Sequence, residues 1–213
     1  MKPGTNMRAF VIILGLASLP GFACVSLAAN EVRRSYQLEQ RGQYKEAYLL
    51  MHKLAESNRQ HYLAHLRAGW LAYKSGYYKA AVYYYRKAVV LAPTAIEPGL
   101  GLMQPLIALA RYKEAETVGR AVLAKDAKNY LARSRLAWSL YLSGRYSEAQ
   151  AYYYYLIVDY PADGEMYIGI GDSLWAQKKY KDACYYYYYA DTILPGDPRV
   201  LKAQKLCSPD TGS

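Results

Sequence analysis

Side chains that catalyse reactions or bind metals are scarce in this chain of 213 residues, which has only three histidines. His61 and His65 lie four residues apart, so on a helix they would share one face, as a pair of zinc ligands does. No cysteine or acidic residue lies nearby at ligand spacing, which disfavours zinc. The sequence also lacks a phosphate-binding glycine loop and a nucleophile elbow. We therefore expect a protein that is not an enzyme and has no cofactor or metal.

Two cysteines, Cys184 and Cys207, lie in the C-terminal part of the chain. An oxidising compartment would allow them to form a disulfide, which would fix the final helix. Two small buried thiols are the alternative, and the sequence leaves both open.

The other groups suited to recognition are aromatic rings and guanidinium groups. Arg67 and Arg135 can each hold a carboxylate through two parallel hydrogen bonds. Rigid aromatic residues interleaved with arginine are typical of binding hot spots. Whether they act together depends on the elements that position them.

Tyrosine and alanine recur as a pair with a period of 34 residues. The pairs are Tyr44/Ala47, Tyr78/Ala81, Tyr112/Ala115, Tyr146/Ala149 and Tyr180/Ala183. Self-similarity at a fixed period of this length indicates an array of helical repeats. Such arrays offer an extended surface to a partner.

Each unit contains the pattern of two amphipathic helices joined by a tight turn. In the second unit, apolar residues at helical spacing predict a helix over 62–75, which Gly76 ends. A second helix follows over 78–91, and Pro93 stops it. The third unit is irregular because Pro105 would remove a backbone hydrogen bond and bend its first helix. That irregularity is either drift at a tolerant position or a local change of curvature.

These residues resemble the tetratricopeptide repeat, which has small, aromatic and proline residues at set positions. The second unit supplies Gly69, Ala81, Tyr85, Ala88 and Pro93, and the fifth supplies Gly171, Ala183, Tyr187, Ala190 and Pro195. The resemblance implies an all-α, right-handed superhelical solenoid of five tandem 34-residue helix-turn-helix repeats plus a C-terminal capping helix. The expected units are 28–61, 62–95, 96–129, 130–163 and 164–197, with the first and third degenerate, and a capping helix and tail over 198–213.

In arrays similar to this one, the first helix of each unit lines a concave groove. The resemblance places ten aromatic and basic residues on or beside the groove positions, including all three tryptophans. They are Arg33, Tyr36, Arg67, Trp70, Tyr73, Lys74, Arg135, Trp138, Tyr141 and Trp175. The Lys/Asn/Arg clamp with which co-chaperones of this family grip a terminal carboxylate is absent, so chaperone-tail binding is not expected. Packing between neighbouring repeats is the alternative role for these aromatic residues.

The N-terminal segment, residues 1–28, is typical of a secretory leader. Lys2 and Arg8 precede an apolar run over 9–19, and cleavage is expected after Ala28 or Ala29. A lipoprotein leader that uses Cys24 is an alternative. Removal of Lys2 and Arg8 lowers the basic residues from 27 to 25 against 17 acidic ones, a net charge of +8. We expect an exported, periplasmic or envelope-associated protein without a membrane span.

The predicted function is a scaffold that binds a protein or peptide in its concave aromatic and basic groove, within a cell-envelope assembly. Tyrosine runs at 83–85, 152–155 and 185–189 offer an alternative, a surface for a polysaccharide or another polymer. RNA binding is a less favoured alternative, because a secretory leader argues against a nucleic-acid partner. The oligomeric state stays open.

Overall fold

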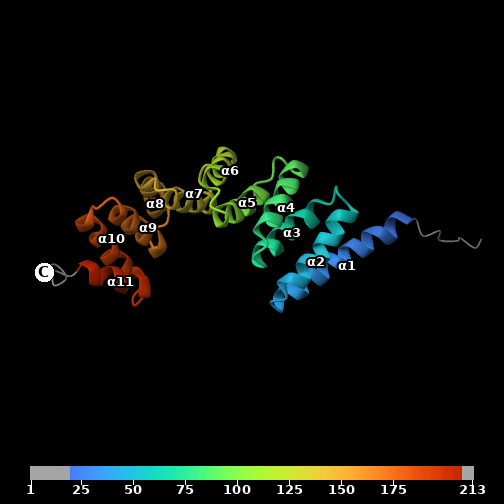
Figure 1. The fold of residues 1–213 in the computed structure, drawn as a ribbon, viewed down its shortest axis with the longest axis horizontal. Coiled ribbons are helices and arrows are strands. Elements are labelled where there is room, and N and C mark those ends of the chain that lie inside the picture. The colour runs from blue at the N-terminus through green and yellow to red at the C-terminus, as the bar shows by residue number, and fades with distance from the viewer. Residues whose placement is uncertain (1–19, 208–213) are drawn as a thin grey trace, which may run out of the picture.

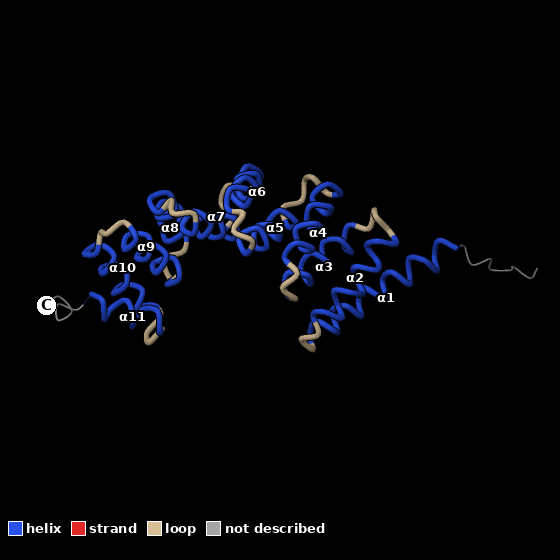
Figure 2. Tube along the Cα trace, viewed as in Figure 1, coloured by secondary structure: helices blue, strands red, loops and turns tan. Residues whose placement is uncertain are grey.

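A computed structural model describes residues 20–207, with side chains placed from residue 28 onward. The described residues form helices and turns and contain no strand (Figure 2). The helices are α1 (Pro20–Gln40), α2 (Tyr44–Ser57), α3 (Tyr62–Lys74), α4 (Tyr78–Leu91), α5 (Glu97–Ala108), α6 (Tyr112–Lys125), α7 (Tyr130–Leu142), α8 (Tyr146–Asp159), α9 (Gly164–Ala176), α10 (Tyr180–Ile193) and α11 (Pro198–Cys207). They follow one another along an arch, with α1 at one end and α11 at the other (Figure 1). The predicted all-α array of five helix pairs and a cap is confirmed.

One kind of turn joins the two helices of every repeat. After α3, Gly76 adopts a φ of +79°, which places it in the left-handed region. The Tyr77 amide donates to the Ala72 carbonyl at 2.8 Å and so satisfies a carbonyl at the helix end. Ala110 and Lys178 take the equivalent turn positions with φ of +54° and +63°. The turn is therefore kept even where glycine is missing.

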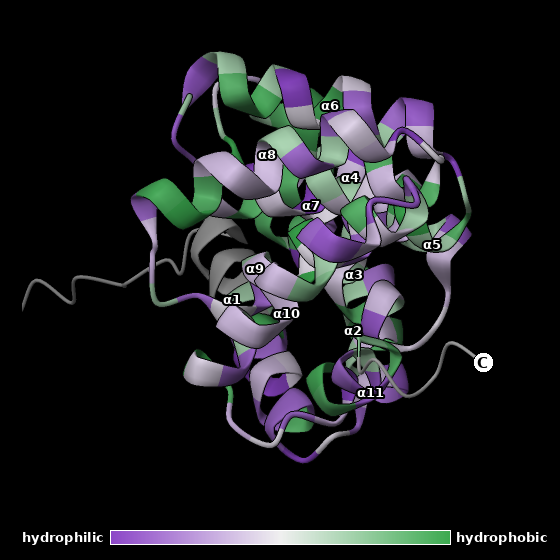
Figure 3. Ribbon diagram, turned by 90° about the vertical axis from the view of Figure 1, so that its left-hand side faces the viewer, coloured by the Kyte–Doolittle hydropathy of each residue, from purple (hydrophilic) through white to green (hydrophobic). Residues whose placement is uncertain are grey.

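The core runs along the array between neighbouring helices. The five repeated alanines, Ala47, Ala81, Ala115, Ala149 and Ala183, are completely buried. Small side chains at these positions let the helices approach closely. Hydrophilic and hydrophobic residues alternate along the outer helices α4, α6 and α8 (Figure 3), so each helix buries only part of its surface.

Tyr85 shows how consecutive repeats are joined. Its ring lies against Gly69 of α3 and Gly101 of α5, where an added Cβ would be 2.9 Å and 2.2 Å from ring carbons. The Tyr85 side chain is 3% exposed. Burial of such a ring stabilises the fold by about 1.5–3 kcal/mol, and here the ring contacts two repeats at once.

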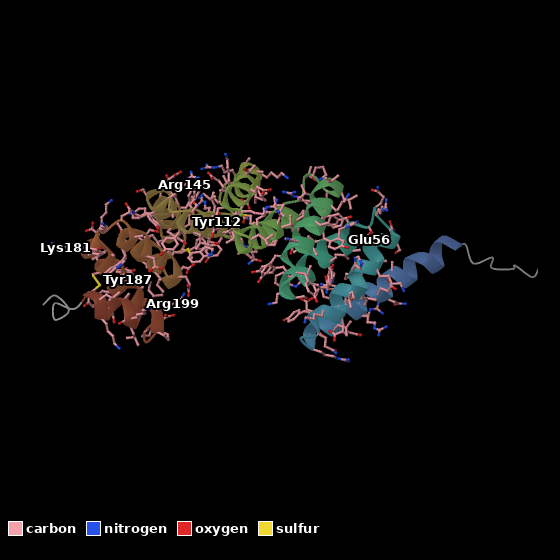
Figure 4. The ribbon with its side chains drawn as sticks, in the orientation of Figure 1. Glu56, Tyr112, Arg145, Lys181, Tyr187 and Arg199 are labelled. Atoms are coloured by element: carbon pink, nitrogen blue, oxygen red, sulfur yellow. A yellow bond between two sulfur atoms is a disulfide. The ribbon has the colours of Figure 1, made fainter. Side chains whose placement is uncertain are left out.

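The helix α11 closes the C-terminal end of the core. Val200 and Ala203 are buried, and a disulfide joins Cys184 of α10 to Cys207. The two Cα atoms are 5.7 Å apart, and the disulfide is visible as a yellow bond in Figure 4. Of the two states that the sequence left open, the structure has the disulfide.

The third repeat accommodates both of its prolines. Pro98 lies in the first turn of α5, where its missing N–H would have no helical partner. Pro105 lies inside α5 and is buried, and the helix continues to Ala108.

Several predictions concern the ends of the chain. Residues 1–19 of the expected leader and 208–213 of the tail lie outside the described residues. So does the side chain of Cys24, the alternative lipid attachment site. The helix α1 begins at Pro20, so the predicted cleavage point falls within it. None of the described helices has the length and apolar character needed to cross a membrane.

Candidate partner-binding groove

A hollow of about 660 Å³ opens along the first helices of the third, fourth and fifth repeats. Its lining comes mainly from α5, α7 and α9, with single residues from α3, α8 and α11. The lining residues are Tyr73, Gln104, Ile107, Ala108, Leu131, Ser134, Arg135, Trp138, Leu142, Tyr153, Glu165, Met166, Ile168, Gly169, Asp172 and Arg199. Three predicted site residues, Tyr73, Arg135 and Trp138, are thus brought to one hollow.

Arg135 is the cationic group on the α7 wall of the hollow. One guanidinium N–H donates to the Leu100 carbonyl oxygen of α5 at 2.6 Å. No acidic side chain in the part of the chain with placed side chains, residues 28–207, forms an ion pair with it. Burial lowers the pKa of the Arg135 guanidinium, since partial removal from water disfavours its charge. An anion that reached the hollow would relieve this penalty.

Trp138 supplies an aromatic surface beside Arg135. Its side chain is 45% exposed, and its ring stacks on Tyr141 with centroids 5.5 Å apart and an interplanar angle of 12°. The stack restricts the indole, and nearly half of Trp138 stays exposed. An exposed, immobilised ring can bind a partner at low entropic cost.

The part of the lining that α9 supplies carries two acidic residues. Asp172 accepts a hydrogen bond from the Tyr187 hydroxyl at 2.8 Å, and burial raises the pKa of the Asp172 carboxyl. Glu165 forms an ion pair with Arg199 at 2.6 Å, which lowers the pKa of the Glu165 carboxyl. Tyr187 and Arg199 both lie at the C-terminal end of the arch (Figure 4). The hollow is therefore basic on its α7 wall and partly acidic on its α9 wall.

A second group of predicted residues lies at the N-terminal end and interacts within the chain. Arg67 is 6% exposed; it pairs with Glu39 of α1 at 2.8 Å and donates to the Ser35 hydroxyl at 2.8 Å. The Trp70 indole N–H donates to the other Glu39 oxygen at 2.6 Å. The Arg67 guanidinium also lies 3.3 Å from the centroid of the Tyr36 ring. This carboxylate-binding cluster is already occupied by Glu39.

The remaining predicted residues lie beside these two groups. The Lys74 ammonium is 5.4 Å from the Trp70 ring, and Arg33 is exposed on α1. Trp175 is half-buried, with its ring 4.7 Å from that of Tyr180. Three of the ten predicted residues thus line the hollow, and the Trp70 ring contacts the Tyr73 ring, with centroids 6.2 Å apart.

The histidine pair has a structural role in α3. The His61 ring accepts a hydrogen bond from the Ala64 amide and caps the helix, and the His65 ring is hydrogen-bonded to the Arg59 carbonyl. Both rings therefore support the start of this helix.

Sequence reasoning missed the acidic wall of the hollow. Asp172 is a carboxylate in the middle of the largely apolar first helix of the fifth repeat. It lies at the groove position that Trp138 takes in the fourth repeat. The sequence signal for this acidic wall was a carboxylate at a groove position of an otherwise apolar helix.

The fold and the groove define a class, the helical repeat arrays. A family model described as "Tetratricopeptide repeat" matches residues 34–96 and 134–198, more than half of the chain. The chain belongs to this family, whose fold is a non-catalytic scaffold for protein contacts. The right-handed superhelix expected from the resemblance is that of the family.

Solved structures of low sequence identity share the fold. YrrB, described as a TPR protein with an unusual peptide-binding site, is 18% identical with a TM-score of 0.72, covering 89% of this chain and 100% of its own. MamA 41-end from Desulfovibrio magneticus RS-1 is 17% identical with a TM-score of 0.73, covering 80% and 97%. TTC0263, a TPR protein of Thermus thermophilus, is 17% identical with a TM-score of 0.63, covering 84% and 97%. No curated protein sequence matches the chain significantly.

Proposed function

We propose that the protein is a non-enzymatic adaptor that binds a peptide or protein segment in the hollow beside α7. The observation that carries this proposal is the hollow itself. There the exposed Trp138 ring adjoins the Arg135 guanidinium, which has no acidic partner within residues 28–207. Aromatic and arginine side chains in a concave site are typical binding hot spots. YrrB, described as having a peptide-binding site, shows that this fold can hold a peptide and supports the same use here.

The test is selection of random displayed peptides on the immobilised full-length protein, followed by affinity measurements on the selected sequences. Trp138→Ala should weaken their binding about tenfold or more, since a hot-spot aromatic contributes about 2 kcal/mol or above. Tyr155→Ala is the matched control, because Tyr155 is an aromatic residue of α8 that is 60% exposed and does not line the hollow. Equal binding by both variants would refute the groove as the site.

We propose in addition that the protein is exported to the cell envelope. The Cys184–Cys207 disulfide supports this, because such bonds persist in oxidising compartments. Cleavage after Ala28 or Ala29 would keep the part of α1 that packs on the array, including the fully buried Ser35. N-terminal sequencing of the native protein should give Ala29 or Asn30, whereas a retained Met1 or a lipid on Cys24 would contradict this leader.

A second candidate function is association with a polysaccharide or another polymer. The exposed tyrosines of α8 and α10 favour it, with Tyr155 and Tyr185 60% and 64% exposed. Their rings offer flat apolar surface and a hydroxyl that stays in water. Retardation in a native gel cast with the candidate polysaccharide, lost on replacing these tyrosines but kept in Trp138→Ala, would select this function over the groove.

A further inference from the structure

The helices α3 and α7 carry the same three groove side chains, 68 residues or two repeats apart. They are Arg67, Trp70 and Tyr73 in α3, and Arg135, Trp138 and Tyr141 in α7. Because α3 begins at Tyr62 and α7 at Tyr130, also 68 residues apart, the two sets occupy equivalent places on their helices. The difference between the sites lies in the helix that precedes each of them.

The α3 set is a complete carboxylate site. Glu39 of α1 receives the Arg67 guanidinium on one oxygen at 2.8 Å and the Trp70 indole N–H on the other at 2.6 Å. Ser35 and Tyr36 complete the surroundings of Arg67. These contacts show what this pair of donors binds when an acceptor is present.

The α7 set has the donors without the acceptor. The residues of α5 that correspond to Ser35, Tyr36 and Glu39 are Met103, Gln104 and Ile107. Among residues 28–207, Arg135 keeps only the Leu100 carbonyl as a hydrogen-bond acceptor, and the Trp138 indole N–H has none. Ile107, Arg135 and Trp138 all line the hollow. The place that Glu39 fills at α3 is therefore open to a molecule from outside.

We propose that Arg135 and Trp138 bind an acidic side chain of the partner, as Arg67 and Trp70 bind Glu39 within the chain. The inference rests on the proposed function and adds the chemistry of the bound segment, an Asp or Glu beside groups that pack on the Trp138 ring. The acidic residues of the α9 wall do not occupy the guanidinium, because Glu165 pairs with Arg199 and Asp172 accepts from Tyr187. The fold contains this pair of donors twice, in α3 and in α7. Glu39 occupies the first pair, and the acidic side chain of the partner occupies the second.

The probes are peptides selected on the wild-type protein, acetylated and amidated, each paired with a twin in which every Asp and Glu becomes Asn and Gln. The wild type should bind the acidic peptide about tenfold or more tightly than its twin, the value of a hydrogen-bonded charge. Arg135→Gln should remove this preference. Trp138→Phe, which removes the N–H donor and part of the ring surface, should lower the affinity for the acidic peptide more than the affinity for its twin. Arg86→Gln, at an exposed arginine outside the hollow, is the control.

Ile107→Glu tests the proposal without touching Arg135 and so does not depend on the folding of the arginine variant. It supplies a carboxylate at the position of Glu39 and should abolish the preference for acidic peptides, whereas Ile107→Gln should keep it. If peptides bind with dependence on Trp138 but the wild type does not distinguish the twins, the acidic partner is refuted and the groove stands. If no selected peptide depends on Trp138, the proposed function itself fails. Selection of peptides that need a free C-terminal carboxylate would also overturn the side-chain assignment.

Discussion

Replacement of Glu39 by Ala is expected to destabilise the first repeat strongly. The Arg67 side chain that Glu39 neutralises is 7% exposed, and Glu39 itself is 23% exposed. The substitution removes the ion pair and leaves the Trp70 indole N–H without its acceptor. Arg67 keeps the Ser35 hydroxyl and the Tyr36 ring, but neither carries a compensating charge.

The magnitude follows from this burial. Removal of one partner of a fully buried pair costs about 3–5 kcal/mol, because a charge remains without compensation. Water can reach Arg67 through the partly exposed Glu39 position, so we expect a value at or just below the lower end of that range, about 2–3 kcal/mol. Glu39→Gln should cost less, because it retains an acceptor for one of the two donors.

Hydrogen exchange measured along the chain is the suitable assay. Units of a repeat array interact only with their neighbours, so a defect at one end need not unfold the whole array. Amides of α1 and α2 should lose protection in Glu39→Ala while those of α9 and α10 keep theirs. Glu165→Gln is the matched control, since the Glu165 and Arg199 side chains are 51% and 53% exposed, and such surface pairs contribute about 0–1 kcal/mol. If Glu39→Ala reduces protection in α1 by no more than Glu165→Gln reduces it in α9, the buried-charge argument is refuted.

Three further predictions concern the core, the acidic wall and the cap. Gly101→Ala should lower the thermal unfolding midpoint, because displacement of the buried Tyr85 ring, at about 1–3 kcal/mol, outweighs a gain in helix propensity of about 1 kcal/mol. Folding raises the pKa of Asp172, so its ionised form opposes folding above the unfolded-state pKa. Asp172→Asn should therefore unfold at an equal or higher temperature at neutral pH, and the advantage should vanish as the pH falls below the pKa of an unfolded aspartate. Cys207→Ser opens a disulfide between residues 23 apart and should cost roughly 3 kcal/mol, seen as faster hydrogen exchange in α11 with little change in α3.

The sequence predicted the helices well because their determinants are local. The tyrosines at the 34-residue period begin α2, α4, α6, α8 and α10, and each turn before them has one residue in the left-handed region. Apolar periodicity and turn glycines act within one unit. Ala110 and Lys178 show that the packed helices can impose the turn even without glycine.

The site was harder to predict because the state of a groove side chain depends on the preceding repeat. Arg67 and Arg135 have the same position and similar helical surroundings in the sequence. The residue 28 positions earlier, Glu39 for one and Ile107 for the other, decides whether the guanidinium has a charged partner within the chain. The types and positions of the groove residues alone therefore do not show which guanidinium is available. That requires comparison of each arginine with the equivalent residue of the preceding repeat.

The register also explains why arginine occurs at these two positions. At three junctions a tyrosine of the second helix, Tyr85, Tyr153 or Tyr187, precedes a small residue of the next helix, Gly101, Gly169 or Ala203. The ring needs that space, since a Cβ at Gly101 or Gly169 would lie 2.2 Å or 2.7 Å from a ring carbon. At the other two junctions the tyrosine is replaced by Met51 or Gly119, and the next helix carries Arg67 or Arg135. Without a tyrosine ring over that position a long side chain fits there, so the same packing choice that joins two repeats decides where the array presents a cation.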